Sequence, residues 1–161
     1  MDVQFKKING YLHKIKILKD NKGNILEHII TPLKIEVRPR DALQVIVGAS
    51  ILAIPVGMTE ETWNLGNKLP LLNVILLTLM GLAFIAMFVY FNYYREVIKS
   101  NKLNFIKRIL MIYILSLLLV AVFLLIIDKF PWNESPLIAV KRLLIITFPC
   151  SLSATISDVI K

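Results

Sequence analysis

The sequence predicts an all-α membrane protein: four transmembrane helices preceded by a short N-terminal cytoplasmic segment with a β-hairpin. Two observations indicate this fold class. Of the 161 residues, 57% are hydrophobic and the mean hydropathy is +0.69, whereas soluble domains are about 45–50% apolar. The chain also contains long stretches without a charged residue. A water-soluble protein of this size could not bury so much apolar surface, so a lipid bilayer is its expected environment.

The uncharged stretches define the expected helices. No Asp, Glu, Lys or Arg occurs in residues 42–59, 69–94 or 109–127, and about 20 apolar residues suffice for a helix to cross a bilayer. A shorter stretch, 143–157, reaches this length if the helix continues backward through Lys141 and Arg142. The predicted helices, within a domain of residues 41–161, are 42–58, 70–93, 107–128 and 137–159. A re-entrant or interfacial segment is the alternative for the last one.

Residues 1–40 are predicted to form a separate cytoplasmic segment. In YLHKIKILKDNKGNILEHIITPLKIEV, apolar and polar residues alternate on both sides of Asp20–Asn24, a pattern typical of a hairpin in which Gly23 supplies the positive φ. Residues 33–37 have further strand character. Because an isolated hairpin is marginally stable in water, we expect it to pack on the membrane domain or on a neighbouring copy. The segment lacks the pattern of a cleavable signal, so the first membrane helix is expected to direct insertion.

The basic residues predict the orientation in the cell membrane. Nine Lys and Arg residues lie in residues 1–40 and five in residues 94–108, whereas the other two connections carry one each, Lys68 and Lys129. Lys and Arg are retained on the cytoplasmic side, so both termini are expected there. The net charge of +8 is thus explained by topology. The lipid bilayer, and not nucleic acid, is the expected partner.

The first and last membrane helices are predicted to form the packed interior. Small residues recur at a spacing of four, at Ala49 and Ala53 in the first helix and at Cys150 and Ala154 in the last. This spacing lets helix backbones approach closely. The two middle helices are rich in Leu, Ile, Phe and Val, which suits contact with lipid.

Each of these two interior helices contains a proline, Pro55 and Pro149. A proline inside a helix removes one hydrogen bond and leaves a carbonyl group without its usual donor. One interpretation is a kink that neighbouring helices compensate. The other is that freed carbonyls and hydroxyls line a polar path, as in the discontinuous helices of transporters.

Glu60 and Glu61 directly follow the first membrane helix, where the negative end of the helix dipole disfavours acidic groups. Thr59 can cap a new short helix whose first turn holds both acids, a favourable place for negative charge. Lys141 and Arg142 are expected on the same outer face and could form ion pairs with them. A cap with an ion pair is the favoured account, and a bound cation is the alternative.

Asp158 lies at the inner end of the last helix. Acidic groups at membrane depth are functional candidates because an unpaired charge there is costly. Asp158 is therefore interpreted as an ion-pair residue or as part of a transport path. The cations expected at a similar depth are Arg38, Arg40, Arg95, Lys107 and Arg108.

No catalytic or metal-binding pattern occurs in the sequence. Cys150 is the single cysteine, and His13 and His28 both lie in the N-terminal segment, so no Ser-His pair or cluster of metal ligands lies in the membrane helices. We predict no enzymatic activity, no cofactor and no metal.

Three stretches carry a resemblance to a known family: VRPRDALQVIVGASILAIPVGMTEETWNLG, KRILMIYILSLLLVAV and FPCSLSATISD. Together they resemble an uncharacterised family of small prokaryotic integral membrane proteins over residues 36–158. The resemblance implies the membrane fold and supplies no substrate. It directs attention to Arg38, Asp41 and Trp63 as interfacial or structural positions, in addition to Glu60, Glu61 and Asp158.

Two functions are compatible with this sequence. The first is a cation or proton channel or transporter, which would be a homo-oligomer because four helices alone rarely enclose a path. Glu60 or Glu61 would attract the cation outside and Asp158 would act inside. The alternative is a non-transporting membrane scaffold or partner subunit that acts through its N-terminal segment. The ion, its direction of movement and the protein partner are left open.

Overall fold

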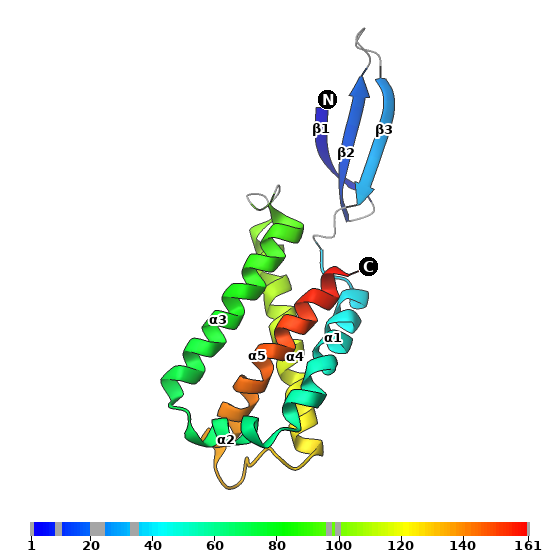
Figure 1. Cartoon of the computed structure of the whole chain (residues 1–161). Coiled ribbons are helices and arrows are strands. Elements are labelled where there is room, and N and C mark those ends of the chain that lie inside the picture. Colours follow the sequence, from blue (N-terminus) through cyan, green and yellow to red (C-terminus); the bar gives the residue numbers. More distant parts are fainter. Residues whose placement is uncertain are drawn as a thin grey trace.

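The computed structural model of the chain describes residues 2–8, 11–19, 25–32, 36–95, 98 and 101–160. These residues form a small β-sheet followed by a bundle of helices (Figure 1). The strands are β1 (Asp2–Ile8), β2 (Tyr11–Lys19) and β3 (Ile25–Pro32). The helices are α1 (Pro39–Gly57), α2 (Glu60–Lys68), α3 (Leu71–Val89), the π-helical turn η1 (Tyr90–Tyr94), α4 (Lys102–Ile126) and α5 (Pro136–Val159).

The predicted membrane fold is confirmed. Within the described residues, four helical segments are long and apolar enough to cross a membrane: α1, α3 continued by η1, α4 and α5. Their bounds lie close to the predicted ones, with the largest difference at the start of α4. This helix begins at Lys102 instead of residue 107. The predicted start depended on the uncharged stretch, whereas a helix can include charged residues where it reaches the membrane interface.

The N-terminal sheet confirms the predicted hairpin and adds a strand. β2 pairs antiparallel with both β1 and β3, so that Ile15 stands opposite Gln4 on one side and Ile30 on the other. β1 was not predicted. The strand expected at residues 33–37 is wrong for Glu36 and Val37, which lie in no strand. Residues 33–35 and the turn around Gly23 lie outside the described residues.

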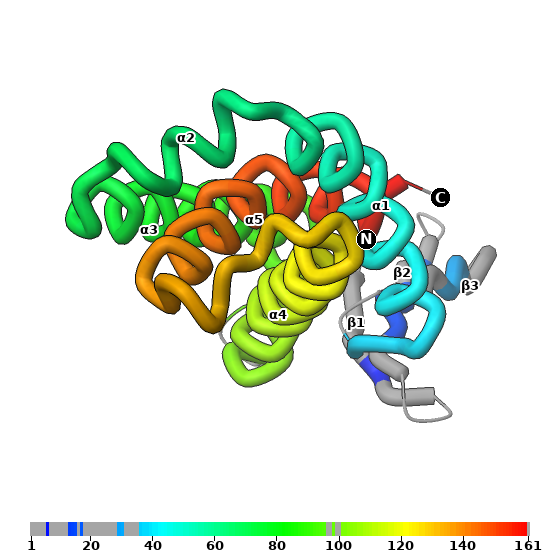
Figure 2. The backbone as a smooth tube through the Cα atoms, turned by 90° about the horizontal axis from the view of Figure 1, so that it is seen from below, coloured from blue at the N-terminus to red at the C-terminus, as the bar shows by residue number. Residues whose placement is uncertain are grey.

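α5 is the central helix of the bundle. It packs against α1, α2, α3 and α4, and Figure 2 shows it running between α1, α3 and α4. Of its most apolar window, 44% is buried inside the protein, compared with 22% for α3 and for α4. The corresponding value for α1 is 33%. The prediction that the first and last membrane helices form the packed interior therefore agrees with the structure, and contact of the middle two helices with lipid stays a prediction.

The closest packing joins α1 to α5 through small residues. Gly48 faces Ser157 and the backbone of Ala154 so closely that no side chain fits at position 48. The hydroxyl of Ser153 donates a hydrogen bond to the Gly48 carbonyl oxygen (2.7 Å), and that of Ser157 donates to the Gln44 carbonyl oxygen (2.9 Å). The two backbones therefore approach closely and are bonded to each other, as small-residue packing in membranes requires.

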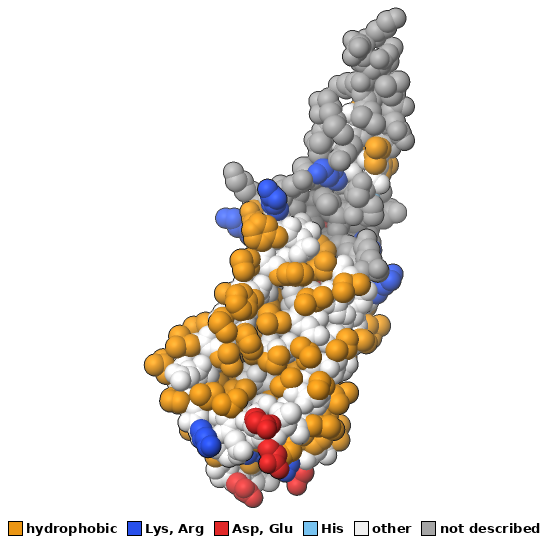
Figure 3. Space-filling view, viewed as in Figure 1, with side chains coloured by type: hydrophobic (Ala, Val, Ile, Leu, Met, Phe, Trp, Pro, Cys, Tyr) orange, Lys and Arg blue, Asp and Glu red, His pale blue; other side chains and the backbone are white. Residues whose placement is uncertain are grey.

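The two ends of the bundle differ in charge. The end where α1 begins and α5 ends, called the sheet end, adjoins the β-sheet, and the opposite end, called the α2 end, carries α2 (Figure 1). On the face drawn in Figure 3, acidic side chains gather at the α2 end, and most of the basic ones lie toward the sheet end. Apolar side chains cover the surface between them, as expected of a protein surface in contact with lipid.

Candidate functional site

The sheet end of the bundle contains a buried cluster of charges centred on Arg108. Its guanidinium group makes two hydrogen bonds with Asp158, from Nε to Oδ2 (2.9 Å) and from Nη2 to Oδ1 (3.0 Å). Nη2 also lies 3.3 Å from Oδ2 of Asp41. The side chains of Arg108 and Asp158 are 0% exposed and that of Asp41 is 4% exposed. Together with Tyr93, these residues are called the Arg108 cluster.

Asp41 is held by the start of α1. Pro39 occupies the first helical turn, where its missing N–H costs nothing, and Asp41 follows at the third position. Its Oδ2 accepts a hydrogen bond from the backbone N–H of Arg38 (3.1 Å). Because the N-terminus of a helix carries partial positive charge, the start of α1 is a favourable position for this acidic side chain.

Asp158 has the opposite environment, since it lies in the last turn of α5. The C-terminus of a helix is electronegative and disfavours a carboxylate. The bidentate contact with Arg108 compensates for this position and has the fork geometry that suits a carboxylate. Asp158 therefore depends on Arg108, whereas Asp41 has a second source of positive potential.

The π-helical turn η1 adds the fourth side chain of the cluster. The ring of Tyr93 lies 4.1 Å from the guanidinium carbon of Arg108, in a cation–π arrangement. Its hydroxyl donates to the backbone carbonyl oxygen of Asp158 (2.8 Å). The next residue, Tyr94, is fully buried and makes an edge contact with Phe105. A π-turn contains one more residue per turn than an α-helix, and here two consecutive tyrosines contact α4.

The Arg108 cluster thus joins all four membrane segments at one end. One guanidinium group and the N-terminus of α1 balance two carboxylates, and the aromatic ring covers the cation. Such an arrangement holds helices in a fixed register. Removing one partner of a buried ion pair costs about 3–5 kcal/mol of stability. Among the residues that the structure describes, no three His, Cys, Asp or Glu side chains are grouped as metal ligands would be.

At the α2 end, Glu60 and Glu61 lie in the first turn of α2 and are exposed. Thr59 stands at the N-cap position, as expected, but its hydroxyl bonds to the Val56 carbonyl oxygen (2.9 Å) and to the hydroxyl of Thr62 (2.7 Å) instead of to a free N–H of the helix. The helix dipole therefore supplies the favourable potential for both acids.

The expected ion pair of these acids with Lys141 and Arg142 is wrong. Within the described part of the chain, neither glutamate pairs with either base. Nζ of Lys141 donates to the Leu69 carbonyl oxygen (2.8 Å) at the C-terminus of α2, where positive charge is favoured. Both bases thus bind the electronegative end of α2 or its surroundings, away from the helix start that holds the acids.

Arg142 and Trp63 also hold α2 in place through hydrogen bonds. Arg142 donates to the Lys129 carbonyl oxygen (3.1 Å) and to Oδ1 of Asn67 (3.3 Å). Nε1 of Trp63 donates to the Gly57 carbonyl oxygen (2.8 Å) at the end of α1, and Nζ of Lys129 lies 4.5 Å from the Trp63 ring centre. Through these contacts, Arg142, Lys129 and Trp63 connect α2 to the end of α1 and to α5.

Pro55 and Pro149 lie inside α1 and α5, which both run on as continuous helices past them. The serine hydroxyls of α5 that face α1 bond to its carbonyl groups, as described for Ser153 and Ser157. This arrangement favours helix packing over a polar path. Of the predicted candidates, the structure brings Asp41 and Asp158 together, while Glu60 and Glu61 lie at the opposite end of the bundle.

The comparison with protein families agrees with this architecture. Residues 18–160 match the family described as "Putative integral membrane protein (DUF2391)". The chain belongs to this family. The resemblance predicted from residues 36–158 is thereby confirmed, and the family match extends to the end of β2 and all of β3. No curated protein and no solved structure matches the chain.

In this member of the DUF2391 family, neither Arg108 nor Tyr93 was predicted from the sequence as a site residue. Arg108 was only one of five cations expected near Asp158. A signal for its burial does exist, because the buried residues of α4 recur at a spacing of four: Arg108, Ile112, Ser116, Val120 and Leu124. No comparable signal exists for Tyr93, since its position depends on the π-turn.

Proposed function

We propose that this integral membrane protein is a scaffold that holds its N-terminal sheet at the cytoplasmic face of the membrane for a protein partner. One observation carries this proposal. The Arg108 cluster ties the four membrane segments together at the same end at which the sheet joins the bundle, and only six residues separate the end of β3 at Pro32 from the start of α1 at Pro39. A rigid anchor next to a short connection suits presentation of a folded element.

The proposed orientation rests on the distribution of charge. The N-terminal 40 residues and residues 94–108, which include the first turns of α4, carry fourteen Lys and Arg residues, and both segments lie at the sheet end. Basic residues close to membrane helices are retained in the cytoplasm. The sheet, both termini and the Arg108 cluster then lie on the cytoplasmic side of the cell membrane, and Glu60 and Glu61 lie outside.

Site-directed photo-cross-linking in native membranes tests the scaffold. A cross-linking amino acid at Ile30, which is 52% exposed on β3, should give a discrete cross-linked protein. The same group at Leu65, 43% exposed on α2, serves as the control at the opposite end and should not give it. In a pull-down with the whole protein, which needs no cross-linker, deletion of residues 1–37 should abolish capture of the same partner. Capture that is identical with and without these residues would rule out the sheet as the binding element.

Transport by a homo-oligomer is the second candidate, and one observation favours it. Glu60 and Glu61 are exposed side by side and form no ion pair with another described residue, so they are available to attract cations. Ion flux into liposomes tests this function, with the wild type beside Glu60→Gln/Glu61→Gln. Transport predicts cation flux that the double substitution abolishes. Absence of flux in the wild type, or equal flux in both proteins, would exclude it.

A further inference from the structure

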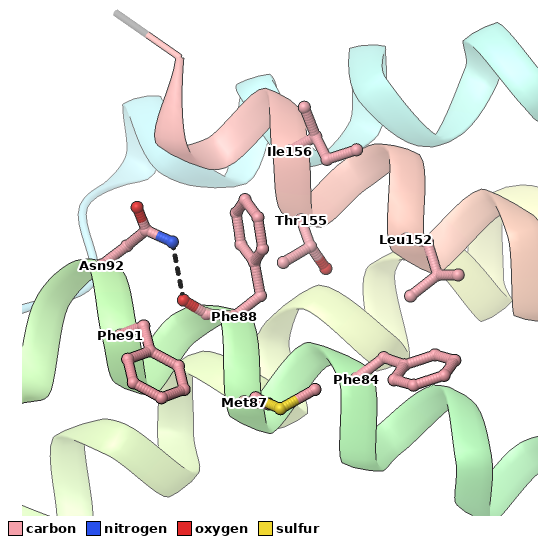
Figure 4. A pocket seen from close by; sticks show the side chains of 8 residues that line it. All are labelled: Phe84, Met87, Phe88, Phe91, Asn92, Leu152, Thr155 and Ile156. Atoms are coloured by element: carbon pink, nitrogen blue, oxygen red, sulfur yellow. Dashed lines mark hydrogen bonds between the residues drawn. The ribbon is translucent and has the colours of Figure 1, made fainter.

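A groove of about 570 Å³ opens on the lipid-facing surface between α3 and α5. Large apolar side chains line it, as Figure 4 shows. Four come from α3 and η1 and two from α5: Phe84, Met87, Phe88, Phe91, Leu152 and Ile156. Its volume is within the range of roughly 300–1,000 Å³ that is typical of small-molecule sites.

The two polar residues of the groove are bonded within their own helices. Nδ2 of Asn92 donates to the Phe88 carbonyl oxygen (2.8 Å), and the hydroxyl of Thr155 donates to the Ser151 carbonyl oxygen (2.6 Å). The first of these bonds is drawn in Figure 4. The groove therefore offers an apolar surface, which suits a hydrocarbon occupant.

The groove and Arg95 together span about one membrane leaflet. At 1.5 Å per residue, the helical path from Phe84 to Arg95 is about 16 Å long, which is half of a hydrocarbon core of about 30 Å. Arg95 continues the helical path of η1 and is exposed. Arg95 follows the last groove residues of this segment, Phe91 and Asn92, toward the sheet end, so it lies beyond the end of the groove where headgroups begin.

We propose that the groove between α3 and α5 holds an acyl chain of an anionic phospholipid whose phosphate is bound by Arg95. A second copy of the chain suits the groove less well. Helices associate in membranes through small residues that let backbones approach, whereas the groove is bordered by phenylalanine, methionine, leucine and isoleucine. These apolar side chains suit a hydrocarbon chain, and the flexible methionine adapts to its shape. The exposed cation complements a negative headgroup. This site is independent of the scaffold function proposed above.

Native mass spectrometry of the full-length protein in detergent tests the site, with dioleoyl phosphatidylglycerol and dioleoyl phosphatidylcholine added separately. The wild type should bind one phosphatidylglycerol at low lipid concentration and phosphatidylcholine more weakly. Ile156→Trp and Met87→Trp should each fill the groove and lose this bound lipid. Both native side chains are at least half exposed, at 50% and 53%, so the bundle should tolerate the changes. The control Leu118→Trp, at a 53% exposed position on α4, should bind lipid like the wild type.

The variant Arg95→Gln tests binding of the headgroup separately from binding of the acyl chain. This variant should bind both lipids equally well, at the level of phosphatidylcholine in the wild type. Retention of the phosphatidylglycerol preference would overturn the role of Arg95. Wild-type lipid binding in both tryptophan variants would overturn the acyl-chain site. If these variants instead convert a dimer to a monomer with no change in bound lipid, a second copy occupies the groove and the proposal is wrong.

Discussion

A buried arginine inside a membrane segment is tolerated only where its charge is balanced, and Arg108 meets this condition through three neighbours. Asp158 accepts two hydrogen bonds, Asp41 lies 3.3 Å away, and the Tyr93 ring covers the guanidinium group. Asp158 has the most to lose from the absence of Arg108, because it would remain in the electronegative last turn of α5 without a counter-charge. The stability of the sheet end therefore depends strongly on one side chain.

Substitution of Arg108 by Gln should destabilise the bundle by about 3–5 kcal/mol, because it leaves a buried carboxylate without its partner. The adjacent Lys107 is exposed, and Lys107→Gln should change stability by about 0.5 kcal/mol or less. Thermal unfolding of both purified variants in detergent measures the difference. Equal unfolding midpoints would show that the Arg108 cluster does not stabilise the protein.

At the scale of the elements, α5 organises the bundle because small residues and hydroxyls concentrate on it. Its contact with α1 is the tightest, as Gly48 leaves no room for a side chain next to Ser157 and Ala154. The α2 helix depends on α5 in a different way, because Lys141 and Arg142 bind polar groups at and beyond its C-terminal end. One helix thus fixes both a membrane segment and an interfacial segment.

Gly48→Leu should disrupt the contact between α1 and α5. The leucine side chain would collide with Ser157 and with the backbone of Ala154, and overpacking costs about 1–3 kcal/mol or more where the backbone cannot move. Val47→Leu is the matched control, because Val47 is 60% exposed toward lipid. Thermal unfolding and gel filtration should show a destabilised or aggregated Gly48→Leu protein beside an unaffected control. A Gly48→Leu protein as stable as the control would contradict the close packing.

The same elements show how far sequence reasoning reaches. The membrane helices were predictable because lipid requires a run of uncharged residues, and the interior faces were predictable from small residues at Ala49, Ala53 and Ala154. Asp158 was a candidate because of its depth in the membrane, and Asp41 because it lies in a stretch that carries the family resemblance. Their common partner was not identified, because depth along a helix does not fix which way a side chain points. The predicted ion pairs of Lys141 and Arg142 with the two glutamates were wrong. Groups on the same face of the membrane need not meet, and backbone carbonyls at a helix end compete with carboxylates for cations.

At the scale of the whole molecule, the arrangement of charge gives the bundle two different ends. Acidic side chains lie exposed at the α2 end. At the sheet end, Asp41 and Asp158 are buried against Arg108, and the exposed side chains of this end include the cations Arg40, Arg95, Lys102 and Lys107. An asymmetric distribution of basic residues determines the orientation in which a protein is inserted into the membrane. A protein with the opposite orientation would have to move the basic N-terminal segment across the membrane.

Labelling of single cysteines tests this orientation in intact cells. Cys150 is buried, and Cys150→Ser removes the native thiol so that new cysteines report alone. With Lys6→Cys on β1 and Glu61→Cys on α2, both at exposed positions, a membrane-impermeant maleimide should label position 61 in intact cells and position 6 only after permeabilisation. The physical reason is the retention of the basic segment on the cytoplasmic side. Labelling of position 6 in intact cells would reverse the assignment, and it would then place the sheet, the Arg108 cluster and any partner of the scaffold outside the cell.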